Sequence, residues 1–294
     1  MENSIKTVSI PPDSHIASVH LRVGNLKRML DFYTGLLGIQ QVDNADSTVR
    51  LSPTGDSRVL IALTEEPHAL PRPPRTSGLY HVAIRVPNRV ELARVLQHLL
   101  SANYPLVGGA DHLVSEALYL TDPEGNGLEI YCDRDRDLWP KYNDQISMST
   151  EPLDFSGLVE LARENATPWS QIHPQTDIGH IHLSVSDLAQ SEAFYTGGIG
   201  FEVTLRSYPG ALFLSAGGYH HHLGMNIWSS RRAPPPPKGS LGLISFEIII
   251  PHQTERQVVI DRLKNNGHLY TRREDQHKKT KFLFSDPDSI LVEI

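Results

Sequence analysis

A histidine, a tyrosine and a glutamate lie within one short stretch, residues 112–129, which reads HLVSEALYLTDPEGNGLE. The stretch predicts a hairpin, because Pro123 fixes φ and Gly125 gives the freedom that a tight turn between two strands needs. Side chains alternate along a strand, so Glu129 should face away from its neighbour Leu128. A carboxylate at mid-strand, on the concave side of a sheet, is suited to ligate a metal ion.

Histidine is the second group that could do chemistry. The chain has 15 histidines. Imidazole binds transition metals and exchanges protons near neutral pH, so clustered histidines indicate a candidate site. Seven of them fall in short motifs, namely His81, His112, His180, His182 and the run His220-His221-His222.

Composition excludes several classes of protein. The chain has 294 residues, with 34 acidic against 27 basic side chains and no polybasic run, which argues against nucleic acid or an anionic membrane as partner. One cysteine, Cys132, excludes an internal disulfide and a multi-cysteine metal site. No apolar run approaches the ~20 residues of a membrane span, and the first residues lack the pattern of a signal peptide. We therefore expect a cytoplasmic protein.

Two stretches early in each half of the sequence resemble one another. Residues 18–38 and 180–200 each combine an alternating strand, a capping Asn or Asp and a helical segment ending in Phe-Tyr-Thr-Gly. The first copy predicts an amphipathic helix from the spacing of its apolar residues. Phe32 and Phe194 mark the offset, which is 162 residues.

A second pair of stretches repeats at nearly the same offset. Residues 78–87 and 242–251 both begin Gly-Leu, and each leads into a helical segment and a hairpin whose turn starts Asp-Pro. The glutamates Glu129 and Glu293 are again 164 residues apart. A fixed offset over several landmarks indicates internal duplication.

The repeats divide the chain into four modules, each strand–helix–strand–strand–strand. We predict an α+β protein in which four tandem βαβββ modules form mixed sheets with helices packed on one side. Residues 14–132 would form an N-terminal pair, residues 178–294 a C-terminal pair, and residues 133–177 a linker with a short helix. The module boundaries are 14–66, 77–132, 178–230 and 240–294, with Pro-rich spacers inside each pair.

This modular pattern resembles the vicinal oxygen chelate superfamily, which includes glyoxalase I, bleomycin resistance proteins and extradiol dioxygenases. The resemblance covers nearly the whole chain. It implies that two modules pair into a U-shaped sheet that cups a metal ion. The ligands would come from the first strand of each module and from a Glu on a last strand.

Three pairings of modules can be compared at the positions that the family uses. Modules one and two, or three and four, each offer a single histidine, together with Ser18 or Ser245, and a serine hydroxyl is a poor ligand for a transition metal. Modules two and three offer His81, His180 and Glu129, the two-histidine, one-carboxylate triad of non-haem Fe(II) sites. We predict this third pairing, within one chain or between chains.

The hairpin stretch resembles the signature of extradiol dioxygenases of the catechol 2,3-dioxygenase type, in His112, Tyr119, the Asp-Pro-Glu-Gly turn and Glu129. The resemblance implies Fe(II), with Mn(II) as a possible substitute, and ring fission of catechol or a substituted catechol by O₂ in aromatic hydrocarbon catabolism. It also implies that His112 and Tyr119 donate hydrogen bonds to the substrate. We expect a homo-oligomer.

The histidine run offers a candidate acid–base catalyst. The family pattern His-His-x-Leu-Ala matches here so that His221 has this role. Plain alternation disagrees, since it places His220 and His222 in the cup instead, as candidate substrate-binding residues. His182 shares a strand face with His180 and is a third substrate-binding candidate.

Two other functions are compatible with this fold. A glyoxalase-like lyase or isomerase would use a metal without O₂, and such sites usually employ more carboxylates. A small-molecule binding protein of the antibiotic-sequestering kind would need no ligand triad. The two histidines, the single Glu129 and the signature Tyr119 favour the dioxygenase.

Overall fold

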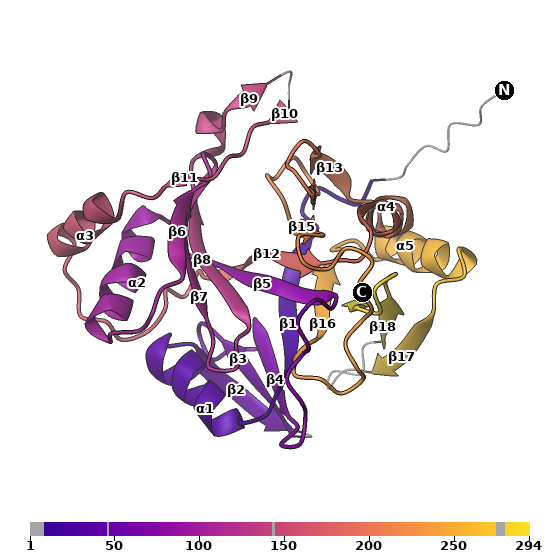
Figure 1. The fold of residues 1–294 in the computed structure, drawn as a ribbon, viewed down its shortest axis with the longest axis horizontal. Helices are drawn as coiled ribbons and strands as arrows, with labels where there is room; N and C mark the ends of the chain where they lie inside the picture. Colours follow the sequence, from indigo (N-terminus) through magenta and orange to yellow (C-terminus); the bar gives the residue numbers. More distant parts are fainter. Residues whose placement is uncertain (1–8, 46, 143–144, 275–279) are drawn as a thin grey trace.

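The computed structural model describes residues 9–45, 47–142, 145–274 and 280–294. In each of the four modules the first strand is followed by a helix and then by three more strands (Figure 1). The elements of module one are β1 His15–Val23, α1 Leu26–Leu30, η1 Asp31–Leu36, β2 Gln40–Ala45, β3 Thr48–Ser52 and β4 Ile61–Glu65. Those of module two are β5 Gly78–Arg85, α2 Arg89–Ser101, β6 Gly108–Asp111, β7 Ser115–Thr121 and β8 Gly127–Asp133.

The second half of the chain repeats this order after a connecting segment. The segment contains η2 Arg136–Leu138, β9 Lys141–Tyr142, β10 Gln145–Ile146, β11 Glu151–Pro152 and the expected helix, α3 Phe155–Glu164. Module three consists of β12 Asp177–Ser184, α4 Leu188–Glu192, η3 Ala193–Ile199, β13 Glu202–Leu205, β14 Ala211–Ser215 and β15 Leu223–Asn226. Module four consists of β16 Gly242–Ile249, α5 Gln253–Asn265, β17 Tyr270–Glu274, β18 Thr280–Ser285 and β19 Leu291–Glu293.

The four modules form two curled mixed sheets, and the α+β fold class is confirmed. Modules two and three share a nine-stranded sheet, in the order β11-β6-β7-β8-β5-β12-β15-β14-β13. Modules one and four share an eight-stranded sheet, in the order β17-β18-β19-β16-β1-β4-β3-β2. In each sheet two first strands pair antiparallel at the centre, β5 with β12 and β1 with β16. The inner modules thus meet within one chain (Figure 1).

Strand alternation decides which side chains reach the core. On β5, Val82 and Ile84 belong to the main hydrophobic core, whereas His81 and Ala83 face the concave side of the inner sheet. On β8, Leu128 joins the same core while Glu129 faces the opposite way. Branched apolar residues therefore pack against the helices. The polar residues face the concave side of the nine-stranded sheet, which we call the inner cup, and the corresponding side of the eight-stranded sheet is the outer cup.

None of the helices in the described part of the chain has both the length and the apolar character of a transmembrane span.

The repeated landmarks of the sequence contact one another. Tyr33, from the Phe-Tyr-Thr-Gly motif of module one, donates a hydrogen bond to Asp122 in the turn of module two at 3.1 Å. Tyr195 of module three makes the same bond to Asp286 of module four at 2.9 Å. These buried bonds join the helix of module one to the hairpin of module two, and the helix of module three to the hairpin of module four. The two halves of the chain therefore share this contact as well as the sequence pattern.

Replacing Tyr33 by Phe is expected to lower the free energy of unfolding by about 1–3 kcal/mol, because the buried Asp122 loses a hydrogen-bond donor. Urea unfolding followed by circular dichroism measures the change. The matched control is Tyr104→Phe, which removes a 2.7 Å bond to the Thr121 carbonyl in a more exposed place. An effect of Tyr33→Phe no larger than that of the control would contradict the structural role of the buried bond.

The helical segments predicted in modules one and three are present, but each combines two types of helix. In both, a short α-helix changes into a π-helix over the Phe-Tyr-Thr-Gly motif. The Thr34 hydroxyl donates to the carbonyl of Leu30 at 2.6 Å, and Thr196 does the same to Glu192 at 2.8 Å. A side-chain donor at this carbonyl competes with the backbone N–H, which favours the wider turn.

Candidate metal centre

One row of residues crosses the centre of the inner sheet and brings two of the predicted ligands together. Glu129 on β8 lies beside Ala83 on β5 in the parallel ladder, and Ala83 pairs with His180 on β12 across the antiparallel ladder. Because residues in one row share a face, Glu129 and His180 flank the small Ala83 side chain. The methyl group leaves room for both to converge above it.

The third predicted ligand comes from the adjacent row. His81 on β5 lies beside Gly127 on β8 and pairs with His182 on β12. A Cβ atom at Gly127 would lie 2.2 Å from the Tyr80 carbonyl oxygen and 3.1 Å from the His81 Cβ, so only glycine lets the strands approach here. His81, Glu129 and His180 thereby offer ligand atoms that all lie within 4.8 Å of one another.

The three side chains converge on one oxygen. His81 Nε2 is 3.0 Å and His180 Nε2 is 3.2 Å from Glu129 Oε2. The His180 contact is a hydrogen bond, whereas His81 Nε2 is buried and not aligned for a hydrogen bond with any described residue. A buried nitrogen without a partner is costly. A cation bound among the three groups would satisfy it, so the donor set fits a metal ion.

The surroundings of His180 and Glu129 shift their pKa values toward the protonation states that bind a metal ion. Burial lowers the pKa of His180 to about 4 against the opposing effect of Glu129, so its imidazole is neutral at neutral pH. Burial by itself raises the pKa of Glu129, but the adjacent His180 and His81 lower it well below its usual value. A neutral imidazole and an ionised carboxylate are the forms that ligate metals.

The triad lies at one side of a cavity of about 490 Å³ in the inner cup. Its polar wall includes His112, Tyr119, His182 and His221, and its apolar wall includes Tyr80, Met148, Phe213 and Trp228. Among the residues that the structure describes, no lysine or arginine lines it. A cavity of this size and character suits a small, mainly apolar organic molecule.

The two signature residues His112 and Tyr119 bond to each other at 2.7 Å. His112 Nδ1 donates to the carbonyl of Ser149, so in the neutral ring Nε2 accepts the Tyr119 hydroxyl proton. Burial and the nearby Glu129 raise the pKa of Tyr119 well above its usual value, which keeps the phenol protonated. The pair is therefore a preformed hydrogen-bonding unit at the cavity wall.

The histidine run contributes one residue to the cavity. His221 lines it, with its ring centroid 4.0 Å from that of His180. His220 is buried behind His221, and His222 accepts a bond from the Ala216 N–H, so neither is among the lining residues. Alternation misleads here because strand β15 begins only at Leu223, after two glycines with positive φ. His182 does line the cavity, and the Asn226 amide bonds its Nε2 at 3.0 Å.

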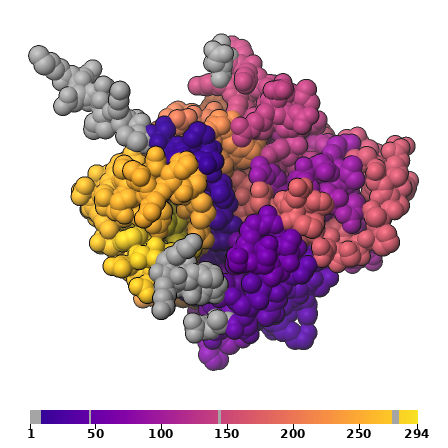
Figure 2. Space-filling view, turned by 180° about the vertical axis from the view of Figure 1, so that it is seen from behind, coloured from indigo at the N-terminus to yellow at the C-terminus, as the bar shows by residue number. Residues whose placement is uncertain are grey.

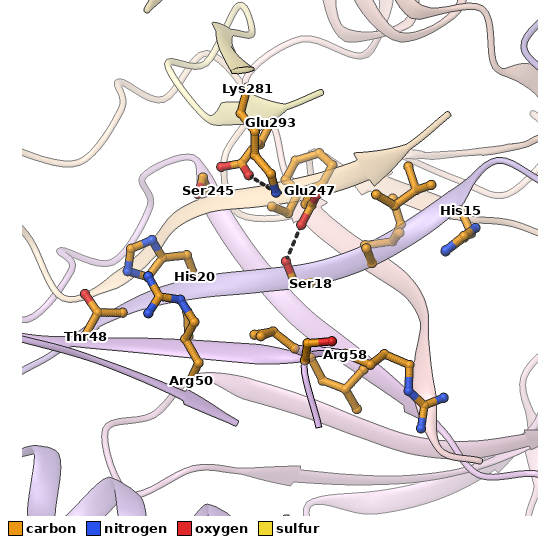
Figure 3. Close-up of a pocket in the computed structure, with 18 of the residues that line it drawn as sticks. His15, Ser18, His20, Thr48, Arg50, Arg58, Ser245, Glu247, Lys281 and Glu293 are labelled. Atoms are coloured by element: carbon orange, nitrogen blue, oxygen red, sulfur yellow. Dashed lines mark hydrogen bonds and ion pairs between the residues drawn. The ribbon is translucent and has the colours of Figure 1, made fainter. Parts of the chain in front are cut away.

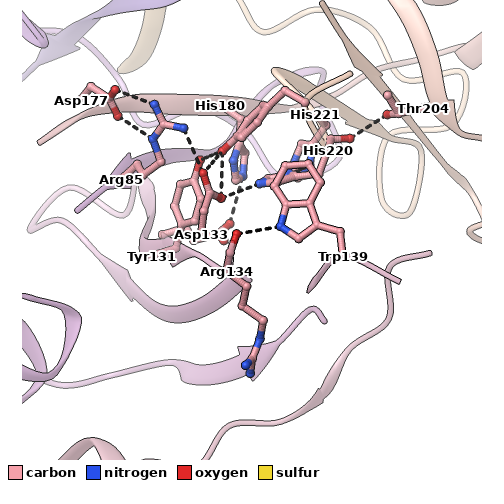
Figure 4. Close-up of polar contacts among 12 residues, drawn as sticks. Arg85, Tyr131, Asp133, Arg134, Trp139, Asp177, His180, Thr204, His220 and His221 are labelled. Atoms are coloured by element: carbon pink, nitrogen blue, oxygen red, sulfur yellow. Dashed lines mark hydrogen bonds and ion pairs between the residues drawn. The ribbon is translucent and has the colours of Figure 1, made fainter. Parts of the chain in front are cut away.

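Asp133 is a residue near the site that the sequence analysis missed. It ends strand β8 and bonds His220 Nε2 at 2.9 Å, while Arg85 pairs with it at 3.0 Å (Figure 4). The signal that could have identified it is strand parity, because Glu129, Tyr131 and Asp133 alternate onto one face. Tyr80 and Trp228, in the apolar wall, had no motif to mark them.

The outer cup, between modules one and four, is larger at about 900 Å³ but lacks the histidine triad. Lys281 Nζ lies 2.6 Å from Glu247 and 2.7 Å from Glu293 (Figure 3). Burial lowers the pKa of Lys281, but the two glutamates outweigh this and raise it, so the side chain stays charged. Arg273 also pairs with Glu293. An ammonium group thus neutralises the carboxylates of the outer cup.

We expect that loading with Fe(II) gives one bound ion per chain. The inner cup offers three converging ligands, whereas Lys281 already occupies the carboxylates of the outer cup. Iron and protein determinations after gel filtration measure the ratio. A ratio near two, or one that Glu293→Ala lowers as strongly as Glu129→Ala does, would contradict this assignment.

Comparison with known proteins gives consistent matches. The family model for the Glyoxalase/Bleomycin resistance protein/Dioxygenase superfamily matches residues 14–130 and 177–294. The chain is 42% identical over 274 residues to catechol-2,3-dioxygenase of Bacillus subtilis (strain 168), covering 92% of this chain and 94% of the relative.

Solved structures agree at the level of the fold. A protein from Bacillus subtilis subsp. subtilis strain 168 matches with a TM-score of 0.68 and 15% identity, over 98% of this chain and 86% of that one. Glyoxalase I from Zea mays matches with a TM-score of 0.58 and 16% identity, over 96% and 92% of the two chains. At these identities the likeness concerns the arrangement of modules alone.

Proposed function

This chain belongs to the glyoxalase/bleomycin resistance protein/dioxygenase superfamily, and from that premise we propose that it is an Fe(II)-dependent extradiol dioxygenase acting on catechol or a substituted catechol with O₂. The observation that carries the proposal is the buried set of His81, His180 and Glu129 beside a cavity. Two imidazoles and one carboxylate with open positions are the donor set of non-haem Fe(II) oxygenases. The relative that is 42% identical supports the same class of reaction.

His81, His180 and Glu129 would hold the metal. When bound, Fe(II) supplies adjacent coordination positions at which the diol and O₂ can meet, and Mn(II) accepts the same donors. The chain's own contribution is to keep the three ligands in place: burial excludes water from them, and the Ala83 and Gly127 positions admit their close approach.

His221 is the group that we propose takes the proton of a catechol hydroxyl. Burial and the neighbouring imidazoles lower the pKa of His221 well below its usual value, so the free ring is neutral and can accept a proton. It lies beside His180, the ligand whose ring centroid is 4.0 Å away. A diol positioned against the triad would therefore have His221 within reach of one hydroxyl.

Tyr119 and His112 offer the substrate a second polar contact, in addition to His221. Tyr119 pairs with Glu129 across strands β7 and β8, so its hydroxyl lies close to the metal ligands. The Tyr119–His112 bond orients both groups toward the cavity wall before any substrate arrives. We propose that on substrate binding the Tyr119 hydroxyl turns its proton from His112 Nε2 to a substrate oxygen, and that this bond stabilises negative charge developing there.

The apolar wall favours an uncharged ring over the sugar or peptide fragments that polar pockets bind. Tyr80, Phe213 and Trp228 surround His182, with ring centroids 5.0, 5.8 and 5.7 Å from it. Aromatic side chains pack well against a planar ring. His182 would contact the ring substituents, because the Asn226 bond holds it in the wall.

The test is to mix the Fe(II)-loaded protein with catechol in air and to follow oxygen uptake and product absorbance together. We expect uptake with formation of a yellow ring-fission product. The matched control is His81→Ala, which removes one ligand from the cup and should stop both signals.

Two outcomes would contradict the proposal. Absence of oxygen uptake, with turnover of a hemithioacetal instead, would indicate the glyoxalase-like reaction. Tight binding of catechol by iron-loaded protein without any turnover would indicate a binding protein of the same fold.

A further inference from the structure

A chain of hydrogen bonds runs from the cavity into the wall behind it. His221 Nδ1 lies 2.7 Å from His220 Nδ1, and His220 Nε2 lies 2.9 Å from Asp133 Oδ1 (Figure 4). His220 and Asp133 do not line the cavity. The remaining nitrogen of His221, Nε2, has no hydrogen-bond partner in the part of the chain that the structure describes.

Asp133 is held as a hydrogen-bond acceptor. Arg85 Nη1 donates to its Oδ2 at 3.0 Å, and the Tyr219 hydroxyl donates to the same carboxylate at 3.0 Å. Arg85 is itself fixed by two bonds to Asp177, of 3.0 and 2.7 Å. A guanidinium can only donate, so the oxygen facing Arg85 must accept.

His220 is fixed from every side. It is fully buried, with the Tyr219 ring 4.1 Å and the Trp139 ring 5.3 Å from its own centroid, and its carbonyl accepts a bond from Thr204 at 2.7 Å. The flanking rings hold the plane of the imidazole, and turning it over would break the hydrogen bonds that its two nitrogens make to His221 and Asp133. Its two nitrogens therefore keep their assigned partners.

These contacts determine where the protons lie. Because Asp133 accepts, His220 must carry a proton on Nε2, and the Nδ1 of neutral His220 is then an acceptor. His221 must accordingly carry its own proton on Nδ1. In neutral His221 this leaves Nε2 with a free lone pair at the cavity.

We propose that Asp133 and His220 are positioning residues that hold the proton of His221 on Nδ1, so that Nε2 is the base for a substrate hydroxyl. This inference rests on the proposed function, since it needs a diol as the proton donor. In the step, the hydroxyl O–H bond breaks, its proton forms an N–H bond at His221 Nε2, and the electron pair stays on the substrate oxygen. No electron leaves the protein, and the reverse transfer restores His221.

The variant that tests the arrangement is Asp133→Asn. Arg85 requires an acceptor, so the new amide should turn its carbonyl oxygen toward Arg85 and its NH₂ toward His220. His220 Nε2 then accepts, Nδ1 carries the proton, and His221 is forced to carry its proton on Nε2. His221 Nε2 then carries a proton and cannot accept one from the substrate, although the side chains keep their shape. A merely structural role of Asp133 would not produce this exchange of tautomers.

The matched control is Asp177→Asn. Asp177 bonds the same Arg85 and loses the same charge when changed, but it does not touch His220. A second variant, His220→Phe, keeps an aromatic ring between Tyr219 and Trp139 but removes the link to Asp133. It leaves His221 free to adopt either tautomer, so it should be less harmful than Asp133→Asn.

Two measurements decide the question. Steady-state kinetics of the Fe(II)-loaded proteins with catechol should give a fall in kcat of about 100-fold or more for Asp133→Asn, with KM and iron content unchanged, and a change within about 3-fold for Asp177→Asn. Nitrogen-15 NMR of histidine side chains in the metal-free full chain, with His221 assigned through His221→Gln, should report the Nδ1–H tautomer in the wild type and the Nε2–H tautomer in Asp133→Asn.

The outcomes separate this inference from the proposed function. Wild-type protein without ring-fission activity would overturn the proposed function, whereas the NMR tautomers would still support the hydrogen-bond chain. An active wild type with an equally active Asp133→Asn would overturn the positioning role. So would an Nε2–H tautomer of His221, or a doubly protonated His220, in the wild-type spectrum.

Discussion

Replacing Glu129 by Ala is expected to abolish both iron retention and ring cleavage. Glu129 supplies the one carboxylate of the triad and lies within 3.2 Å of both imidazole nitrogens. Loss of a supporting partner alone typically costs about 10–100-fold in metal affinity or activity, so loss of a ligand should exceed about 100-fold. Iron content after desalting and kcat with catechol are the two measurements.

The fold should survive this change. His180 stays neutral without the carboxylate because burial already lowers its pKa to about 4, so no uncompensated charge is left in the cup. Replacing one member of a buried charged set is otherwise strongly destabilising. The midpoint of thermal unfolding of metal-free Glu129→Ala should therefore lie close to that of the metal-free wild type.

Glu293→Ala is the matched control, since Glu293 has the equivalent place on the last strand of the outer cup. It pairs with Lys281 and Arg273 instead of histidines. We expect this variant to keep its iron and its activity. An active Glu129→Ala enzyme, or loss of iron in Glu293→Ala alone, would show that the wrong cup was assigned.

Replacing His221 by Ala is expected to leave iron content unchanged and to lower kcat by about 100- to 10,000-fold, the usual contribution of a positioned acid or base. His221 lines the cavity but is not among the three converging ligands. Steady-state kinetics with catechol, together with iron analysis, separate this effect from loss of the metal.

His222→Ala is the natural control because it changes the adjacent imidazole, which faces Tyr219 and Phe201 instead of the cavity. It should retain most of its kcat. If turnover survives in His221→Ala and falls in His222→Ala, the acid–base role belongs to His222, and the strand start must rearrange when substrate binds.

The sequence by itself predicted the α+β fold class and a set of candidate metal ligands. Offsets of 162 and 164 residues identified the repeats, and strand parity assigned His81, His180 and Glu129 to one kind of face. Both signals can be read without a structure, because repeats appear when the sequence is compared with itself and strand alternation acts over a few residues. The resemblance to the vicinal oxygen chelate superfamily implied which strand positions carry ligands, and the serines Ser18 and Ser245 at two of these positions led to the prediction that modules two and three supply the metal ligands.

The tertiary structure decided what depends on register and on distant partners. Pairing of β5 with β12 in one chain follows from sheet order, which no local pattern contains. His221, and not its neighbours, lines the cavity because the chain before Leu223 is irregular and breaks alternation. Asp133 reaches His220 from 87 residues away. Such contacts form only when strands from separate modules pack together, so the sequence could supply the donors but not the hydrogen-bond chain that orients them.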